Sequence, residues 1–196
     1  MAEKIVLATH NAGKIREFKS ILEPLGYEAV SVHDVIADIT EPEETGKTFA
    51  ENALLKATYY MKATGLPCLA DDSGIAADAL GGRPGVYSAR YAGPDCDDEA
   101  NNQKLIADLA VFPPQQRTVH YICSLVLIWP DGRTVTAEGS CDGVLRDFYA
   151  GDNSFGYDPL FYVPEKGKTM AEMTMEEKNA ISHRGKALKK LVEALS

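Results

Sequence analysis

Two adjacent carboxylates occupy the short segment Ala70-Asp71-Asp72-Ser73-Gly74. The apolar run from Leu66 to Ala70 predicts a strand, and the polar residues behind it predict that the strand ends there in a sharp turn. Ligands of open α/β sheets bind beyond the carboxyl ends of strands. Neighbouring carboxylates repel each other, and a hard cation such as Mg²⁺ is the usual reason to hold them together. A solvated Asp-Ser-Gly turn is the alternative interpretation.

A second candidate site lies where a strand, a polar loop and a helix follow one another near the start of the chain. Residues 4–9 are mostly apolar, as in a strand buried on both faces, and a helical apolar stripe begins at Ile15. The loop between them, Thr9-His10-Asn11-Ala12-Gly13-Lys14, therefore meets a helix N-terminus, where free backbone N–H groups favour an anion. Lys14 opposes the helix dipole unless a polyanion binds there. An exposed, tolerated lysine is the alternative.

An acidic loop precedes the next predicted helix. The loop spans residues 38–46 and contains Glu41, Glu43 and Glu44. It leads into Thr48-Phe49-Ala50-Glu51, which has the pattern of a capping box and predicts a helix that runs to about residue 64. The acidic loop therefore closes onto a helix start, and a solvated acidic loop is the alternative interpretation.

Basic and aromatic residues recur near the end of the chain. Phe155-Gly156-Tyr157-Asp158-Pro159 enters a short strand, and Lys178, His183 and Arg184 precede a final helix predicted over residues 186–195. The three basic residues either face a ligand or form a basic surface beside the helix.

Composition limits the class of protein. The 196 residues fit one domain or two closely packed lobes, and a net charge of −9 argues against non-specific nucleic-acid binding. The strand predicted over residues 118–129, the Asp131-Gly132 turn and a returning strand predict a mixed sheet. Four cysteines without paired spacing predict reduced thiols. The sequence shows no signal peptide and no membrane span, so we expect no membrane association and a cytoplasmic location.

The motifs together resemble the inosine triphosphate pyrophosphatase family, whose members act on non-standard purine nucleoside triphosphates. Each motif is weak singly, but their order and spacing are specific and cover nearly the whole chain. One departure is Ser154, where the family more often has glycine. The matching segments are Thr9-x-Asn11-x-x-Lys14, Thr48-Phe49-x-Glu51-Asn52-Ala53, Ala70-Asp71-Asp72-Ser73-Gly74, Gly81-Gly82-x-Pro84-Gly85, Phe155-Gly156-Tyr157-Asp158-Pro159 and Ser182-His183-Arg184.

The resemblance implies an α/β fold of two lobes around a long mixed β-sheet with flanking helices, and an active-site cleft between the lobes. It implies a single pyrophosphatase domain over residues 1–196 that assembles as a homodimer. The implied reaction is Mg²⁺-dependent hydrolysis of inosine, deoxyinosine and xanthosine triphosphates to the monophosphate and pyrophosphate.

The resemblance also assigns residues by position. Asp72 is the expected catalytic base, and Glu43 and Asp72 are the expected Mg²⁺ ligands, with Glu43 preferred to Glu44 on its spacing to Gly46. The expected substrate-binding residues are Thr9, His10, Asn11, Ala12, Gly13, Lys14, Ser73, Phe155, Gly156, Tyr157, Asp158, Lys178, His183 and Arg184.

Physical chemistry agrees with this interpretation and leaves two alternatives. Phosphoryl transfer depends mainly on positioning and charge stabilisation, which Lys14, Lys178 and a helix N-terminus can supply. Phe155 and Tyr157 can flank a purine ring. A general nucleotide phosphatase with an aspartyl nucleophile is one alternative, but adjacent side chains diverge on an extended backbone. A non-catalytic nucleotide-binding regulator is the other, and it has little need for carboxylates beside the phosphates.

Overall fold

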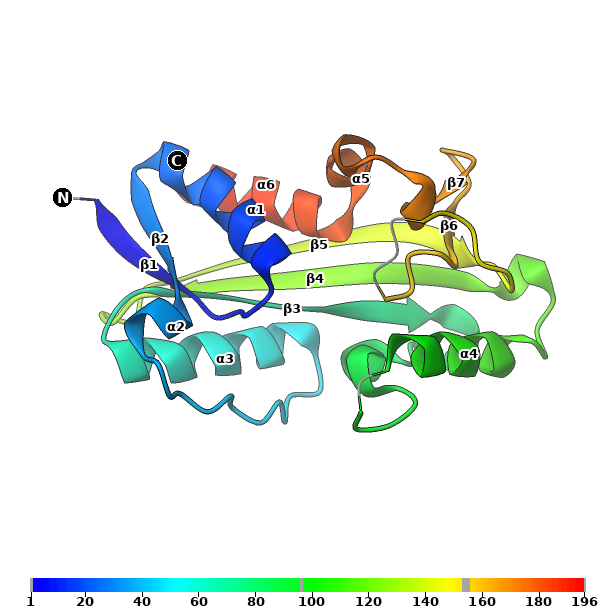
Figure 1. Ribbon diagram of the computed structural model, residues 1–196, viewed down its shortest axis with the longest axis horizontal. Helices are drawn as coiled ribbons and strands as arrows, with labels where there is room; N and C mark the ends of the chain where they lie inside the picture. The colour runs from blue at the N-terminus through cyan, green and yellow to red at the C-terminus, as the bar shows by residue number, and fades with distance from the viewer. Residues whose placement is uncertain (1, 96, 153–155, 196) are drawn as a thin grey trace. The chain divides into compact units, whose positions relative to one another are not determined.

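The computed structural model describes residues 2–95, 97–152 and 156–195 (Figure 1). The strands are β1 (Glu3–Leu7), β2 (Tyr27–Ser31), β3 (Cys68–Ala77), β4 (Thr118–Ile128), β5 (Thr134–Leu145), β6 (Phe161–Val163) and β7 (Lys168–Thr169). The α-helices are α1 (Ala12–Leu22), α2 (Val32–Val35), α3 (Phe49–Thr64), α4 (Asp98–Leu109), α5 (Met175–Ile181) and α6 (His183–Leu195). Among the described residues, no helix is long and apolar enough to cross a membrane.

The strands form one sheet with the order β2-β1-β3-β4-β5-β6-β7. Strand β1 pairs in parallel with β2 and β3, whereas β6 pairs antiparallel with β5 and β7. A tight turn at Asp131 and Gly132 joins β4 to β5, with the amide of Trp129 donating to the carbonyl of Arg133 at 2.9 Å. The predicted mixed α/β sheet with flanking helices is therefore confirmed.

The chain divides into two compact units, as the prediction of two lobes requires. Unit 1 comprises Met1–Asp72, Cys123–Gly139 and Lys186–Ser196, and unit 2 comprises Ser73–Ile122 and Ser140–Gly185. Each unit is described by itself below. A cleft between the two stays a prediction.

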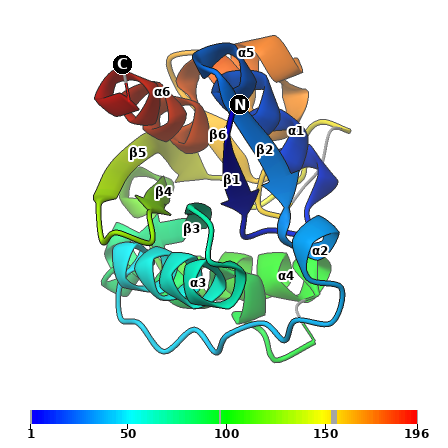
Figure 2. The ribbon, with the colours of Figure 1, turned by 90° about the vertical axis from the view of Figure 1, so that its left-hand side faces the viewer.

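Unit 1 has two apolar layers because successive strand residues point to opposite faces. Helices α1 and α6 cover one face of its strands and α3 covers the other (Figures 1 and 2). The core under α1 and α6 includes Ile5, Leu7, Leu69, Phe18, Leu22, Leu188 and Leu191. The core over α3 includes Val6, Ala8, Cys68, Ala70, Ala53, Ala57 and Tyr60.

Strand β3 does not end at Ala70, so the predicted sharp turn is wrong. The strand continues through Asp71, Asp72 and Ser73 to Ala77. The alternation explains why it can continue. Asp71 shares the face of Leu69 and Asp72 shares the face of Ala70, so the carboxylates point apart and each meets a lysine of its own.

Unit 2 has a single apolar core. This core includes Ile75, Leu105, Leu109, Val119, Tyr121, Tyr157, Leu160, Phe161, Met170 and Met173. One expectation about its elements needs correction. Helix α6 begins at His183 rather than near residue 186, and a separate short helix, α5, carries Lys178. A capping box at Thr174 and Glu177 starts α5.

The cysteines that the structure describes lie in the interior. Cys68, Cys123 and Cys141 are buried, and no disulfide joins them. Cys96 lies outside the described residues.

Candidate active site

Helix α1 begins at the loop that the sequence singles out as an anion site. The side chain of Asn11 caps the helix and accepts from the amides of Gly13 at 2.9 Å and Lys14 at 3.1 Å. A Cβ on residue 13 would lie 3.0 Å from Oδ1 of Asn11, so glycine leaves the room that the cap needs. Residues 10–13 are exposed, and Thr9 is half-buried and accepts from the amide of Asn11. The predicted strand, loop and helix are confirmed.

Lys14 is not a free surface lysine. Its Nζ lies 2.8 Å from Oδ2 of Asp71, whose side chain is 2% exposed, while that of Lys14 is 22% exposed. The first turn of α1 is thereby joined to β3 on the face that α1 covers. The alternative of an exposed, tolerated lysine is wrong for the described structure.

Asp72 lies on the opposite face of β3 in an acidic and basic cluster. Nζ of Lys56, on α3, lies 3.4 Å from Oδ1 of Asp72 and 2.8 Å from Oε1 of Glu44. All three side chains are largely buried, with exposures of 16% for Lys56, 12% for Asp72 and 26% for Glu44. Two carboxylates from separate segments thus share one ammonium.

Burial sets the proton affinities in this cluster. It raises the pKa of Asp72 above the ordinary value, and Glu44 adds to the rise while Lys56 opposes it. Burial also opposes the charge on Lys56, but its carboxylate neighbours outweigh that effect and raise the pKa of Lys56. The ammonium of Lys56 therefore stays charged beside its carboxylate neighbours.

Asn52 ties the acidic segment to α3. Its Oδ1 accepts from the amide of Gly46 at 2.8 Å, and a Cβ on residue 46 would lie 2.5 Å from the same oxygen. Asn52 also faces the carboxylate of Asp72 and lowers its pKa in doing so. Yet Nδ2 of Asn52 and Oδ2 of Asp72 are buried and have no partner with hydrogen-bond geometry among the described residues.

The predicted capping box of α3 is only half formed. Thr48 accepts from the amide of Glu51 at 3.1 Å, as predicted. Oε2 of Glu51 accepts instead from the amide of Lys47 at 2.6 Å, one residue before the cap. The segment that carries Glu44 is therefore fastened to α3 at Gly46 and Lys47.

His10 turns away from the helix start toward the acidic segment. One of its ring nitrogens contacts His33 of α2, and Nε2 contacts Oε1 of Glu41. His10 thus links the loop before α1 to a carboxylate of residues 38–46. Glu43 is exposed, and its expected role as a metal ligand stays a prediction.

Unit 2 holds the second group of predicted site residues. Asp158 is buried, and its two oxygens have different donors. The hydroxyl of Tyr121 donates to Oδ1 at 3.0 Å, and Nζ of Lys178 forms a short ion pair with Oδ2. Sequence separates these residues widely, yet the structure brings them together.

Two side chains of helix α4 form hydrogen bonds with the segment just before Asp158. The amide of Gly156 donates to Oδ2 of Asp98 at 3.1 Å, and its carbonyl accepts from Nδ2 of Asn102 at 3.0 Å. Tyr157 is 6% exposed, and its hydroxyl donates to the carbonyl of Ser88 at 2.7 Å. Its ring belongs to the core, which disfavours the stacking role suggested for it. Phe155 lies outside the described residues.

His183 and Arg184 open helix α6, and both are half-buried. The imidazole of His183 stacks on the ring of Tyr121, with centroids 4.8 Å apart. Ser73 is half-buried and directly follows Asp72 in β3. The structure therefore groups His183, Lys178 and Asp158 around one tyrosine.

Four contributing residues are absent from the expected site residues: Lys56, Asn52, Tyr121 and Asn102. A signal existed for the first two, because Asn52 and Lys56 are polar residues four positions apart in one helix and so share a face. Tyr121 gave no such signal, since an aromatic residue in a largely apolar strand is expected to pack in the core. Asn102 was hidden in a polar helix.

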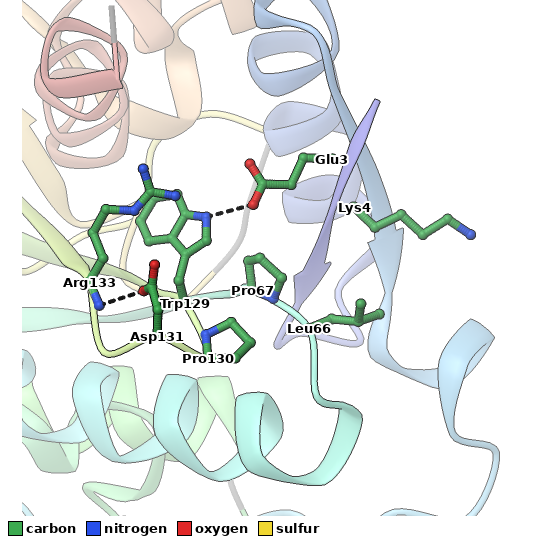
Figure 3. A pocket seen from close by; sticks show the side chains of 8 residues that line it. All are labelled: Glu3, Lys4, Leu66, Pro67, Trp129, Pro130, Asp131 and Arg133. Carbon is green, nitrogen blue, oxygen red and sulfur yellow. Dashed lines mark hydrogen bonds between the residues drawn. The ribbon is translucent and has the colours of Figure 1, made fainter. Parts of the chain in front are cut away.

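A separate cavity of about 420 Å³ lies in unit 1 at the start of β1, whereas the loop predicted to bind an anion follows the end of that strand. Four of its lining residues, Glu3, Trp129, Asp131 and Arg133, contact one another (Figure 3). Nε1 of Trp129 donates to Glu3 at 2.9 Å, and the guanidinium of Arg133 lies 3.8 Å from the centre of the Trp129 ring. Lys4 points away from these rings in Figure 3. None of the predicted substrate-binding or metal-binding residues that the structure describes lines this cavity.

Comparisons with known proteins agree with the motifs. The dITP/XTP pyrophosphatase of Desulforamulus reducens is 53% identical over 193 residues, which cover 98% of this chain and 96% of that protein. The dITP/XTP pyrophosphatase of Bacillus subtilis is 50% identical over 193 residues, covering 98% and 97% of the two chains. The Staphylococcus aureus Ham1 protein has a TM-score of 0.91 at 42% identity and 98% coverage of both chains. The Ham1 family itself matches residues 5–194. The chain therefore belongs to the Ham1 family.

Proposed function

We propose that this protein hydrolyses inosine, deoxyinosine and xanthosine triphosphates to the corresponding monophosphate and pyrophosphate. The observation that carries the proposal is the pair of diverging aspartates on β3. Asp71 anchors Lys14 at the start of α1, while Asp72 faces Lys56 and Glu44. An anion site and a buried carboxylate cluster thus flank one strand. The relatives at about half identity that are named dITP/XTP pyrophosphatase support the substrate class.

The residues around Asp72 fit a divalent cation. Oδ2 of Asp72 is buried with no hydrogen-bond partner among the described residues, and Lys56 already occupies the position of a cation between two carboxylates. Hard oxygen donors suit Mg²⁺, which ordinarily keeps several waters or phosphate oxygens as its other ligands. No group of three His, Cys, Asp or Glu residues in the described ranges could hold a metal, so two carboxylates with substrate oxygens are the fitting arrangement.

We propose Asp72 and Glu44 as the protein ligands, because the structure brings Glu44 to the same ammonium as Asp72. Glu43 is the sequence-based alternative. When bound, the metal would neutralise charge on the phosphates and lower the pKa of a coordinated water. Comparing Glu44→Gln with Glu43→Gln separates the two candidates. The correct ligand should raise the Mg²⁺ concentration needed for half-maximal turnover, and the other substitution should leave it unchanged.

The chain's own groups can bind and orient a triphosphate. The start of α1 provides the positive end of a helix dipole, and Lys14 lies in the same turn, while the amides of Gly13 and Lys14 donate to the Asn11 cap. Asp72, whose pKa burial raises, is a better proton acceptor than an exposed aspartate. Its role would be to orient or deprotonate the attacking water.

The basic residues of unit 2 can distinguish purine bases by hydrogen bonding to the substituent at the 6-position. Inosine and xanthosine carry a 6-keto acceptor, whereas adenosine carries a 6-amino donor. Arg184 has only donors and His183 can donate, so both match the keto group. An adenine amino group would leave such a donor buried and unpaired, which costs about 1–3 kcal/mol.

The proposed function includes three further properties: the oligomeric state, the metal requirement and the absence of nucleic-acid binding. We propose that the protein acts as a homodimer, that it depends on Mg²⁺, and that it binds no nucleic acid. The last follows from the net charge of −9. The cytoplasmic location stays a prediction from the sequence.

Product identification tests the proposed reaction against its alternatives. Inosine triphosphate is incubated with the protein with and without Mg²⁺, and the phosphorus-containing products are identified. Equal amounts of inosine monophosphate and pyrophosphate, formed only with Mg²⁺, are expected. Release of orthophosphate would point to a phosphatase instead. Tight binding without turnover would point to a regulator.

A further inference from the structure

Tyr121 occupies a position that no predicted role explains. It lies on the part of β4 that belongs to unit 2, and it is 7% exposed. Its hydroxyl donates to Oδ1 of Asp158 at 3.0 Å, and the other oxygen of Asp158 receives the ammonium of Lys178. The tyrosine therefore fixes one oxygen of Asp158 and leaves the second for Lys178.

The ring of Tyr121 forms the middle of an aromatic stack. The ring of Phe161 lies on it at a centroid distance of 4.3 Å and an interplanar angle of 13°. The imidazole of His183 also stacks on it, at 4.8 Å and 20°. Phe161 is fully buried and belongs to the core, so it provides a rigid support for Tyr121. Tyr121 in turn sets the plane of the His183 ring.

We propose that Tyr121 is a positioning residue for substrate recognition, which orients His183 through its ring and the Asp158–Lys178 pair through its hydroxyl. The proposal rests on the proposed function, because that function assigns Asp158, Lys178 and His183 to the nucleotide. Tyr121 itself is not a candidate acid or base. Burial, with the nearby Asp158, raises its pKa well above the ordinary value, so the hydroxyl stays protonated and donates.

The hydroxyl and the ring can be removed separately. Tyr121→Phe keeps the stack with Phe161 and His183 and removes only the donor to Asp158. Tyr121→Leu removes both. Because Phe fills the same volume, Tyr121→Phe retains the packing of a buried residue and is the decisive variant.

The same unit supplies a matched control. The hydroxyl of Tyr91 donates to Oδ2 of Asp108 at 2.5 Å, and Nζ of Lys104 lies 3.1 Å from the same oxygen. Tyr91, Asp108 and Lys104 thus repeat the tyrosine, aspartate and lysine contacts with no predicted site residue among them. Tyr91→Phe deletes the same kind of hydrogen bond, so it reports what that loss does to stability alone.

Steady-state kinetics with inosine triphosphate test the proposal. Tyr121→Phe should raise KM by about fivefold or more, which corresponds to one hydrogen bond, and leave kcat within about twofold. Tyr91→Phe should lower the melting temperature and leave KM unchanged. In an Asp158→Ala background, Tyr121→Phe should raise KM no further, because the hydroxyl acts through Asp158. An unchanged KM in Tyr121→Phe, or an equal rise in Tyr91→Phe, would overturn the proposal.

Calorimetric binding of inosine monophosphate distinguishes this proposal from the proposed reaction. Binding requires no hydrolysis, so Tyr121→Phe should weaken it by a similar factor whether or not inosine triphosphate is turned over. If the unmodified protein binds the monophosphate but hydrolyses nothing, the proposed reaction fails and the Tyr121 measurement still stands. Equal affinities of Tyr121→Phe and the unmodified protein would reject the positioning role on their own.

Discussion

The ion pair between Lys14 and Asp71 makes a testable statement about stability. Lys14→Met removes the ammonium and keeps an apolar stem of similar length. The side chain of Asp71 is 2% exposed, so its carboxylate cannot replace the lost partner with bulk water. Breaking a buried pair costs about 3–5 kcal/mol, and the 22% exposure of Lys14 places this pair below that range.

One smaller effect completes the estimate of the stability change. Removing a cation from the first turn of α1 returns about 0.3–1 kcal/mol through the helix dipole. The net loss should therefore be about 2 kcal/mol, or about 4–8 °C in melting temperature for a chain of this size. From the sequence alone we would expect Lys14→Met to be slightly stabilising, because the unfavourable helix dipole is the only interaction of Lys14 that the sequence reveals.

Thermal unfolding of three variants separates the ion pair from a general effect of lysine removal. Lys4 pairs with Glu28 at 3.5 Å, but both side chains are about half exposed, so Lys4→Met should change stability by less than about 1 kcal/mol. Asp71→Asn in the Lys14→Met background should recover part of the loss, because the amide carries no charge that the missing ammonium would have to balance. A Lys14→Met protein with the same melting temperature as the unmodified protein would refute this reasoning.

Three further predictions concern turnover, pH and base selection. Asp72→Asn should keep the fold and reduce kcat by about a thousandfold or more, measured as pyrophosphate release; near-normal turnover would remove Asp72 from both proposed roles. His120 contacts Asp142 at 2.8 Å and Asp78 at 3.1 Å, and these carboxylates raise its pKa despite the opposing effect of burial. The ion pairs of His120 should therefore stabilise the fold fully below about pH 6.5, and this stabilisation should be lost as the pH rises through the folded-state pKa of His120. If the melting temperature of His120→Gln depends on pH as that of the unmodified protein does, the prediction is wrong. Arg184→Ala should narrow the kcat/KM ratio of inosine triphosphate to ATP by harming the good substrate more; an unchanged ratio would exclude Arg184 from base selection.

The sequence predicts the parts of the site that depend on local pattern. The strand, polar loop and helix around Asn11 and Lys14 follow from apolar spacing and capping chemistry, and the structure confirms them. The divergence of Asp71 and Asp72 follows from the period of an extended backbone. Both inferences need only neighbouring residues.

Features that depend on distant partners could not be predicted in this way. Strand β3 continues through Asp72 because Lys14 and Lys56, from two different helices, receive the carboxylates. The choice of Glu44 over Glu43 as the neighbour of Lys56 depends on how Asn52 and Glu51 fasten the acidic segment to α3. Sequence spacing within the loop carries no information about those contacts.

The aromatic residues show the same limit. Tyr157 reads as a ring that could flank a purine, yet its hydroxyl bonds to the backbone of Ser88 and its ring is buried. Tyr121 reads as an ordinary strand residue, yet it contacts two predicted site residues. An aromatic residue serves packing or recognition according to its tertiary neighbours, which the pattern of a single sequence does not reveal.

The most direct test of the proposed activity is the ratio of kcat/KM for inosine triphosphate to that for ATP, measured on the unmodified protein in Mg²⁺. Sites that hydrogen-bond a substrate group can reject a mismatched analogue by factors of about 10⁴, so we predict a large preference for inosine and xanthosine triphosphates over ATP. Guanosine triphosphate retains the 6-keto group and should be discriminated less strongly. Comparable values for ATP and inosine triphosphate would contradict the proposed substrate class and indicate a general nucleotide pyrophosphatase.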